Sequence, residues 1–353
     1  MAITFDRKKL LDILVSVRGN VPEAELSDIS KYIIFQQGRI HAFNDLAGMT
    51  IPFDPEMDDC AADSQLVFEF VRNLPDKDIL MGVKDGVLRL QGASRTGEDI
   101  VKAEIPLRDD FMYPRELVQE DADTYKRLPE TFYTALESVG IACDDDPGAS
   151  SVIAIKEGYA YARGRLIACR YYLGDEAKEL MDETIFVPPS ILNYVNRNSP
   201  KVYKIQDNWM HLMDKNKHIL SVRSRHDQHY PFEAVDSMML EFDAERFMLP
   251  AGMKDVLTRC VPFSGHNAKL RRVDITLDRG ILTVVAGRSD GSRIMERLTA
   301  KKTEGKIRFA VNVGVLGKVI EYADDYICDD GLLVGTAVNF NAAVSLEAIN
   351  DNR

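Results

Sequence analysis

The sequence lacks the motifs that identify most enzymes and metal sites. It has no Walker-type or dinucleotide-type glycine loop, no His-Glu-x-x-His motif and no Gly-x-Ser-x-Gly motif. Its five cysteines lie far apart and none belongs to a Cys-x-x-Cys pair, which argues against a zinc site and suits reduced thiols. We therefore identify no catalytic residues, and we expect no metal and no cofactor.

Long apolar runs and an excess of positive charge are also missing. No segment approaches the roughly 18–20 apolar residues that a membrane-spanning helix needs. The first residues lead into an amphipathic helical pattern without the apolar stretch of a signal peptide. We therefore expect a cytoplasmic protein with no membrane partner. The net charge of −12 argues against a generally basic nucleic-acid-binding protein, but it allows a locally basic surface.

What the sequence does contain is an internal repeat. One marker is a glycine turn inside an alternating apolar segment, which recurs after 120 and 122 residues at Gly38, Gly158 and Gly280. A second marker is a two-residue turn signal, which recurs after 122 and 123 residues and ends at Gly86, Asn208 and Gly331. The period is too long for a solenoid and is about the size of one small domain. It predicts three copies of one domain, at residues 1–122, 123–235 and 236–353.

Each copy shows two helical patterns and two groups of strands. Apolar residues at helical spacing predict first helices over residues 6–17, 129–139 and 251–261. Second helices are predicted over residues 65–74, 188–198 and 312–322. The strand runs alternate between apolar and polar residues, which indicates sheets with one buried face. The fold class is therefore α+β, with two helices packed on antiparallel sheets in each copy. Residues 107–126 and 230–240 are interpreted as domain boundaries.

Acidic clusters raise the alternative of a metal-dependent nuclease, because carboxylates that converge can hold two metal ions. The clusters are Asp58-Asp59, Asp109-Asp110, Asp144-Asp145-Asp146, Asp324-Asp325 and Asp329-Asp330. They fall in expected turns, where aspartate bonds its own backbone, and solvated turns are the simpler interpretation. His226 and His229 have no third ligand nearby and are assigned to a surface loop. The single tryptophan, Trp209, is assigned to the edge of a hairpin turn.

Three segments carry a resemblance to a known family. They are residues 4–11 (TFDRKKLL), 165–169 (RLIAC) and 307–316 (IRFAVNVGVL). Their order on the threefold repeat resembles the bacterial β sliding clamp, the processivity factor of the replicative DNA polymerase, over nearly the whole length. The resemblance is distant, which suggests a diverged or phage-encoded member.

The resemblance implies a ring rather than an enzyme. Each chain would form a half-ring of three clamp domains, and two chains would join head to tail as a homodimer. The ring would encircle double-stranded DNA without sequence preference, with helices lining the hole and sheets outside. A clamp loader would open it, and a DNA polymerase would be tethered to it. The alternative is a clamp-fold scaffold that binds proteins without encircling DNA, which acidic residues in the hole (Asp12, Glu137 and Asp255) would favour.

The resemblance also implies three sets of site residues. The candidates for DNA contact are Lys8, Lys9, Arg18, Arg72, Arg127, Arg197, Lys201, Lys254 and Lys318, although each could equally belong to a solvated helix face. The partner-peptide groove would use Tyr161, Arg165, Leu166 and Leu270, with Met238 or Met239 from a connecting strand. Leu166 and Leu270 could equally be core residues. The dimer interface would include Pro262 and Phe263.

The sequence departs from the family at three places. The chain ends in residues 348–353 (AINDNR) instead of an apolar tail, which puts the selection of partner peptides in doubt. The loop after the first helix reads PEAE at residues 22–25 where the family has an arginine, which puts a DNA contact there in doubt. Pro262 and Phe263 stand where the family has two aliphatic residues.

Overall fold

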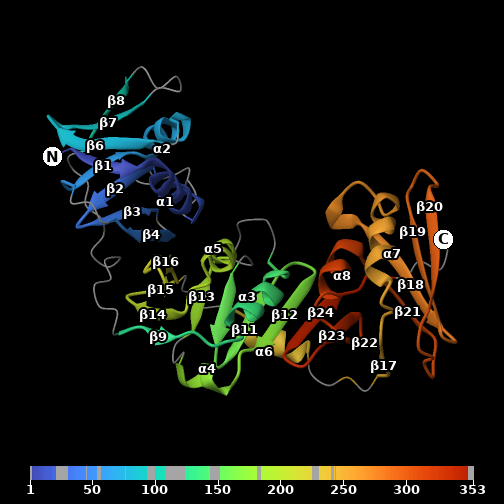
Figure 1. Ribbon diagram of the computed structural model, residues 1–353. Helices are drawn as coiled ribbons and strands as arrows, with labels where there is room; N and C mark the ends of the chain where they lie inside the picture. The colour runs from blue at the N-terminus through green and yellow to red at the C-terminus, as the bar shows by residue number, and fades with distance from the viewer. Residues whose placement is uncertain are drawn as a thin grey trace. The chain divides into compact units, whose positions relative to one another are not determined.

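The computed structural model describes residues 2–20, 31–44, 46–53, 57–75, 77–93, 100–108, 124–143, 152–180, 184–224, 230–239, 242 and 244–348 (Figure 1). The chain divides into two compact units, each made of two stretches of sequence. Unit 1 comprises Met1–Leu128 and Ser190–Arg225, and unit 2 comprises Pro129–Pro189 and His226–Arg353. The three domains predicted from the repeat stay a prediction.

Unit 1 contains an eight-stranded and a four-stranded antiparallel sheet, ordered β5-β2-β3-β4-β16-β15-β14-β9 and β1-β6-β7-β8. Its strands are β1 (Ile3–Asp6), β2 (Tyr32–Gln36), β3 (Arg39–Phe43), β4 (Ala47–Pro52), β5 (Cys60–Asp63), β6 (Asp78–Lys84), β7 (Val87–Ala93), β8 (Ile100–Pro106), β9 (Lys126–Arg127), β14 (Val202–Gln206), β15 (Trp209–Met213) and β16 (Ile219–Arg223). Its helices are α1 (Arg7–Asn20), α2 (Ser64–Asn73) and α5 (Ile191–Asn198).

Unit 2 has the same two kinds of sheet, ordered β13-β10-β11-β12-β24-β23-β22-β17 and β20-β19-β18-β21. Its strands are β10 (Ile153–Lys156), β11 (Tyr159–Arg163), β12 (Ile167–Tyr172), β13 (Ile185–Val187), β17 (Arg246–Phe247), β18 (Arg272–Asp278), β19 (Ile281–Gly287), β20 (Arg293–Thr299), β21 (Ile307–Asn312), β22 (Asp325–Asp329), β23 (Leu332–Thr336) and β24 (Phe340–Ser345). Its helices are α3 (Phe132–Gly140), α4 (Asp175–Leu180), α6 (Phe232–Ser237), α7 (Met253–Cys260) and α8 (Val313–Val319), with 3-10 turns η4 (Val261–Phe263) and η5 (Ala268–Leu270).

The repeat markers are the turns of equivalent hairpins. Two-residue hairpin turns of the type I′ kind need a positive φ at both central residues, which favours Gly, Asn and Asp. Positive φ angles occur in pairs at Gln37-Gly38, Glu157-Gly158, Arg279-Gly280, Asp85-Gly86, Asp207-Asn208 and Asp330-Gly331. The glycines at the first three turns therefore mark β2–β3, β10–β11 and β18–β19, and the other three turns join β6–β7, β14–β15 and β22–β23.

The two eight-stranded sheets are built in the same way. In each, the strands that follow one helix pair with strands from a distant part of the chain. We call the β4–β16 pair the first seam and the β12–β24 pair the second seam; both are antiparallel. In the first sheet β2-β3-β4 lies on one side of the seam and β16-β15-β14 on the other. In the second sheet β10-β11-β12 and β24-β23-β22 hold the same places. The same local unit therefore assembles twice within one chain.

The six helices predicted from the sequence are present near their predicted bounds. Apolar residues at helical spacing face inward, as Leu10, Leu14 and Val17 do on α1. Two of the predicted second helices, α2 and α8, follow a residue whose side chain caps the first helical turn. The Asp63 carboxylate accepts a hydrogen bond from the Leu66 backbone N–H at 2.9 Å, and the Asn312 side chain accepts one from Gly314 at 2.9 Å. The predicted α+β class with antiparallel sheets is confirmed.

The connecting strand predicted to carry Met238 and Met239 is wrong. Residues 232–237 form α6, and the two methionines follow in a turn. Val235 and Met239 are buried, because Pro231 begins a short amphipathic helix that covers a sheet face. Helix α4 was also not predicted. Trp209 is the first residue of β15 and is 8% exposed, packed beneath Arg223.

Candidate functional site

Unit 1 carries exposed cations on two adjacent helices. Lys8 and Lys9 lie on the exposed side of α1, and Arg197 lies on the exposed side of α5, which packs against α1. Lys201 follows α5 and is also exposed. Within the part of the chain that the structure describes, these four side chains have no ion-pair partner. Their charge is therefore available to an anion.

Arg18 and Arg72 are held against α2 instead. The Arg18 guanidinium lies 4.7 Å from the Phe68 ring and donates to the Gln65 amide oxygen. Arg72 lies 5.4 Å from the same ring and pairs with the Glu69 carboxylate at 2.5 Å.

Arg127 does not lie on a helix. It belongs to edge strand β9, where it is exposed opposite Val202. The structure thus groups Arg18 with Arg72, and separately groups the α1 and α5 cations, while Arg127 joins neither group.

The cations predicted in unit 2 are engaged within the chain. Lys254 on α7 pairs with the Glu321 carboxylate at 2.6 Å, and this partner raises the Lys254 pKa. Lys318 on α8 donates to the Ile141 carbonyl at the end of α3, at 3.5 Å. Both side chains remain exposed, where such contacts contribute little to stability. Asp255 is exposed beside Lys254 on α7, and the exposed Glu137 on α3 has no cation on its own helix.

Three of the residues predicted for the peptide groove belong to or pack against one apolar cluster in unit 2. Tyr161 and Met239 are buried in one apolar cluster on the sheet face under α6, and Met238 packs against it. Phe232 of α6 contacts Tyr161 edge-on, with ring centroids 5.1 Å apart. An ion pair of 2.7 Å joins Arg170 of β12 to Asp236 of α6. The helix therefore covers the apolar face and leaves a cavity of about 410 Å³ at its end, lined in part by Met239 and Arg170.

The other groove residues lie apart from this cluster. Arg165 is exposed and Leu166 half-buried in the turn between β11 and β12, where the Leu166 carbonyl accepts from the Ser345 backbone N–H at 2.9 Å. Leu270 lies on η5 and is 72% exposed, which rules out the alternative of a core residue for it.

The outer strands of the four-stranded sheets are β1 and β8 in unit 1, and β21 and β20 in unit 2. β8 and β20 hold the places at which the eight-stranded sheets continue across a seam, and in the described chain no strand pairs with either of them there. Pro262 and Phe263 form η4 directly after α7, and η4 packs against β19 of the sheet that ends in β20. The residues predicted for the dimer interface thus lie beside the open edge of unit 2.

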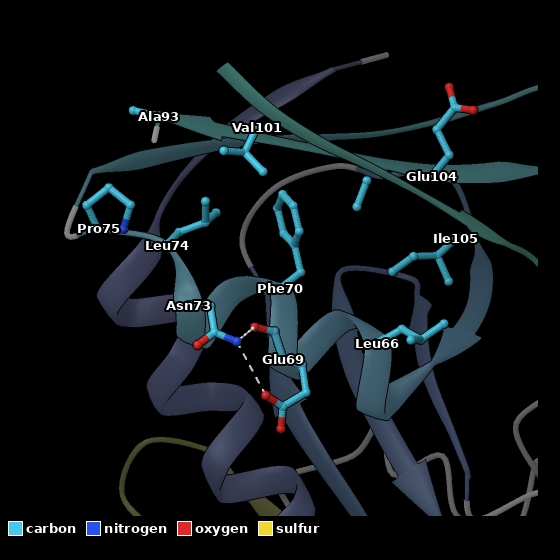
Figure 2. A pocket seen from close by; sticks show the side chains of 11 residues that line it. Leu66, Glu69, Phe70, Asn73, Leu74, Pro75, Ala93, Val101, Glu104 and Ile105 are labelled. Atoms are coloured by element: carbon cyan, nitrogen blue, oxygen red, sulfur yellow. Dashed lines mark hydrogen bonds between the residues drawn. The ribbon is translucent and has the colours of Figure 1, made fainter. Parts of the chain in front are cut away.

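An apolar cavity of about 600 Å³ lies along the open edge of unit 1, between α2 and β8. Figure 2 shows Leu66 and Phe70 from α2, and Val101 and Ile105 from β8, directed into the same space. Leu66 is 52% exposed and Val101 is 38% exposed. Exposed apolar side chains are therefore grouped beside a strand edge that has no partner in the described chain.

The described residues give no support to a metal-dependent enzyme. They contain no group of three or more His, Cys, Asp and Glu side chains placed to hold a metal ion. The clusters at residues 109–110 and 144–146, His226, His229 and the loop at 22–25 lie outside the described residues, as does the C-terminal stretch from residue 349. Within the same described ranges, no helix combines the length and apolar character needed to cross a membrane.

Sequence reasoning missed the aromatic cover of the unit 2 sheet. Tyr230, Phe232 and Phe186 complete the cluster around Tyr161. The signal was the spacing of Phe232, Val235 and Met239 after a proline, which places three apolar side chains on one helical face.

Comparison with solved structures identifies the architecture. The chain superimposes on the β sliding clamp of Caulobacter crescentus with a TM-score of 0.81 and 13% identity, covering 99% of this chain and 100% of that one. The fold is that of a sliding clamp. The DNA polymerase sliding clamp of Pseudomonas aeruginosa gives a TM-score of 0.79 at 12% identity, and a putative DNA polymerase III beta subunit from Eubacterium rectale gives 0.78 at 14%, with the same coverage.

The sliding-clamp fold explains the paired architecture of the two sheets, and the fold expected from the resemblance is confirmed. No protein-family model and no curated protein matches the sequence. The likeness to these structures is therefore one of fold, at 12–14% identity.

Proposed function

We propose that this protein is a DNA sliding clamp. Two copies join head to tail into a ring that encircles duplex DNA without reading its sequence, and the ring tethers a replicative DNA polymerase. A clamp loader opens and closes it, and the protein performs no chemistry of its own. The identities of 12–14% to bacterial clamps suit a diverged member of cytoplasmic replication machinery, such as one that a phage encodes.

One observation supports the proposal: the two four-stranded sheets match, strand for strand, the two halves of each eight-stranded sheet. In each complete sheet, a β2-β3-β4 type half meets a β16-β15-β14 type half. The sheet β21-β18-β19-β20 is a half of the first type, and β8-β7-β6-β1 is a half of the second type. One chain therefore has one unpaired half of each type, at β20 and β8. Two copies can satisfy both edges by pairing β20 of each with β8 of the other, which closes a ring.

The charge distribution supports encirclement rather than tight binding. A clamp must stay on DNA without being held at one place, and strong phosphate contacts would oppose sliding. The protein has a net charge of −12, yet the exposed side of α1 and α5 presents Lys8, Lys9 and Arg197. A modest local positive surface on an acidic protein meets this requirement.

Two measurements test the proposal. The mass of the native protein in solution should be twice that of the 39.7 kDa chain. After loading by its clamp loader, the protein should stay on nicked circular DNA and be lost when the circle is cut. A protein that stays equally on circular and linear DNA binds it by contact alone, and a protein that neither dimerises nor stays on circles is a scaffold of the same fold.

A further inference from the structure

The two seams within the chain share one register, so their residues can be compared one by one. The residue that follows β4 and the residue that follows β12 each donate a backbone hydrogen bond of 2.8 Å to the glycine of the adjacent hairpin turn, Gly38 or Gly158. Thr50 and Arg170 each lie three residues before that donor and are therefore equivalent.

The strands on the other side of each seam align in the same way. The residues that follow β16 and β24 donate backbone hydrogen bonds of 2.7 and 2.8 Å to the second residue of equivalent hairpin turns. Ile219 and Asn341 each lie five residues before these donors. Thr50 pairs with Ile219 in the first seam. Arg170 pairs with Asn341 in the second, so equivalent positions meet at both seams.

In the second sheet this register lines up four polar side chains from four adjacent strands, which Figure 1 shows side by side as β12, β24, β23 and β22. Arg170 lies opposite Asn341, Asn341 lies opposite Thr336, and Thr336 lies opposite Asp325. Directly opposed residues share a face of the sheet, and neighbouring strands lie about 4.8 Å apart. The four side chains therefore form a row about 14 Å long. We call it the β12–β22 row, and all four members line the cavity of about 410 Å³ at the end of α6.

The fold does not require polar side chains in this row. The equivalent positions of the first sheet hold Thr50, Ile219, Met213 and Val202. Three of these four side chains are apolar, and the same pairing of strands accommodates them. The polar character of the β12–β22 row therefore reflects something other than strand pairing.

The members of the β12–β22 row keep hydrogen-bonding capacity for a ligand. Within the described residues, the side chains of Asp325, Thr336 and Asn341 have no hydrogen bond and no ion pair. The Arg170 guanidinium contacts Asp236 of α6 at 2.7 Å, but its Nε atom is buried and has no partner in the same described ranges. Polar groups that converge on a cavity in this way fix the orientation of a bound ligand.

Next to the β12–β22 row the cavity is apolar. Ile327 and Val334 lie opposite each other on β22 and β23, and both are buried. Met239, which follows α6, is also buried and lines the same cavity. These three side chains form an apolar floor that can take a large apolar side chain of a ligand.

The charges around the cavity favour a cationic ligand. Asp324 and Asp325 line it at the β22 end, and neither has an ion-pair partner in the part of the chain that the structure describes. Arg246 is exposed on the same rim, and Arg170 is already neutralised by Asp236. Among the described residues, two unpaired carboxylates therefore accompany one unpaired guanidinium, and the excess charge is negative.

We propose that this cavity binds an extended peptide of a partner protein in which a lysine or arginine adjoins a large apolar residue. The cationic side chain meets the two carboxylates at the β22 end, and the apolar side chain lies on the apolar floor. The backbone bonds the row, because Asn341 and Thr336 can each donate and accept, and Arg170 Nε donates to a carbonyl. An extended chain covers about 14 Å with four residues.

The cavity is separate from the groove that the family resemblance implies around Arg165 and Leu166. Those residues lie in the turn before β12, where Leu166 contacts Ser345. The cavity lies farther along β12, beside Asn341 and the turn between β23 and β24. Met239 is common to both sets of residues, so the two sites adjoin. The inference requires neither a ring nor DNA, and it stands or fails independently of the proposed function.

Peptide binding to the full-length protein tests the ligand class. The probes are blocked tetrapeptides with adjacent lysine and phenylalanine between two alanines, in both orders, measured by calorimetric titration. At least one order should bind with a Kd below about 1 mM. Norleucine in place of lysine should weaken binding about five-fold, as expected for the loss of one partly exposed ion pair. Glutamate at that place should weaken it further. Equal binding of the three peptides, tighter binding of the glutamate peptide, or no binding below this limit overturns the proposal.

A carboxylate variant places the peptide in the cavity. Asp325→Asn should weaken the lysine peptide by the same factor of about five and leave the norleucine peptide unchanged, because the ion pair is already absent there. Asp329→Asn is the matched control, since Asp329 is exposed on the same strand and does not line the cavity. An equal loss with both variants would show general attraction to an acidic surface and would contradict the proposed site.

A double variant tests the β12–β22 row without changing the pairing of strands. Thr336→Met with Asn341→Ile installs the residues that the first sheet has at the equivalent positions, Met213 and Ile219. Chemical denaturation should show a folded protein, while the affinity for the lysine peptide should fall at least about ten-fold because two hydrogen-bonding side chains are lost. Unchanged affinity in the folded double variant would overturn the row as the binding surface.

Discussion

The first and second seams have the same strand order and register, but the corresponding faces of their sheets differ in chemistry. At the first seam, His41 Nδ1 lies 3.0 Å from the Thr50 hydroxyl oxygen, and His211 Nδ1 lies 2.7 Å from the Ser221 hydroxyl oxygen. All four residues are buried. Burial lowers the pKa of each histidine to about 4, so both are neutral at physiological pH.

The second seam has no such polar row. The equivalent positions hold Tyr161, Arg170, Ala343 and Val334. Three of these belong to the apolar cluster beneath α6, and Arg170 bonds Asp236 of that helix.

The comparison shows that seam register and seam chemistry are separable. Backbone pairing determines which residues lie opposite each other across a seam. The side chains then determine which conditions destabilise that seam. The first seam depends on two histidines staying neutral, whereas the second depends on an apolar cover that a short helix supplies. The two units should therefore unfold under different conditions.

The largest expected difference is the response to acid. Each buried histidine has a folded-state pKa of about 4 against about 6.5 when unfolded, so the unfolded chain binds more protons between these values. Stability from the neutral histidines is fully present above pH 6.5 and is lost as the pH falls towards 4. The loss is on the order of 3 kcal/mol for each histidine. Hydrogen exchange should show β3–β4 and β15–β16 opening at a higher pH than β11–β12 and β23–β24.

The control for this prediction replaces both histidines. His41→Asn with His211→Asn lowers the starting stability but should remove the difference in acid response between the two units. Equal opening of the two seams across this pH range in the wild-type protein would show that the buried histidines do not govern the first seam.

Removing one hydroxyl partner should have the next largest effect. Ser221→Ala deprives the buried His211 of its 2.7 Å contact and should lower the free energy of unfolding of unit 1 by about 1–3 kcal/mol. Ser345→Ala, an exposed serine at the end of β24, should change stability by less than about 0.5 kcal/mol. Chemical denaturation of the two variants measures both values, and similar losses would contradict the distinction.

The units should also differ in their contribution to DNA contact, if the protein encircles DNA. Lys8→Glu with Lys9→Glu removes two cations that have no ion-pair partner in the described chain. The salt dependence of DNA retention should then weaken by a slope of about 2. Lys254→Glu with Lys318→Glu should weaken it less, because these side chains already contact Glu321 and the Ile141 carbonyl. Equal slopes for the two double variants would show that both units approach phosphate alike.

The smallest effect is expected at the cover of the second seam. Asp236→Asn removes the ion pair with Arg170, which is part-exposed and should contribute under about 1 kcal/mol. The sharper readout is local: hydrogen exchange of residues 230–239 should rise while that of the first seam stays unchanged. Glu233→Gln, on the same helix but exposed, is the matched control, and an equal rise there would mean that the ion pair does not hold α6.

The helices were predictable because each carries its own signal, an apolar stripe near a capping residue or a glycine turn. Helix α6 was missed because its six residues follow a proline within a segment that has the composition of a linker. The cations on α1 could be named from the sequence, because they lie on the polar side of a clear apolar stripe. The sequence could not show which predicted cations lack an ion-pair partner. The partner of Lys254, for example, is a residue beyond α8, and no local pattern encodes that contact.

By itself, the sequence determined the repeat, the turns that mark it and the helices within it, because positive φ angles and apolar spacing are local requirements of the chain. Only the tertiary structure decided that β4 meets β16, that β12 meets β24 and that β8 and β20 are left open. Antiparallel strands pair through backbone groups that every residue has, and the choice among partners depends on how whole units pack rather than on any residue in the strand.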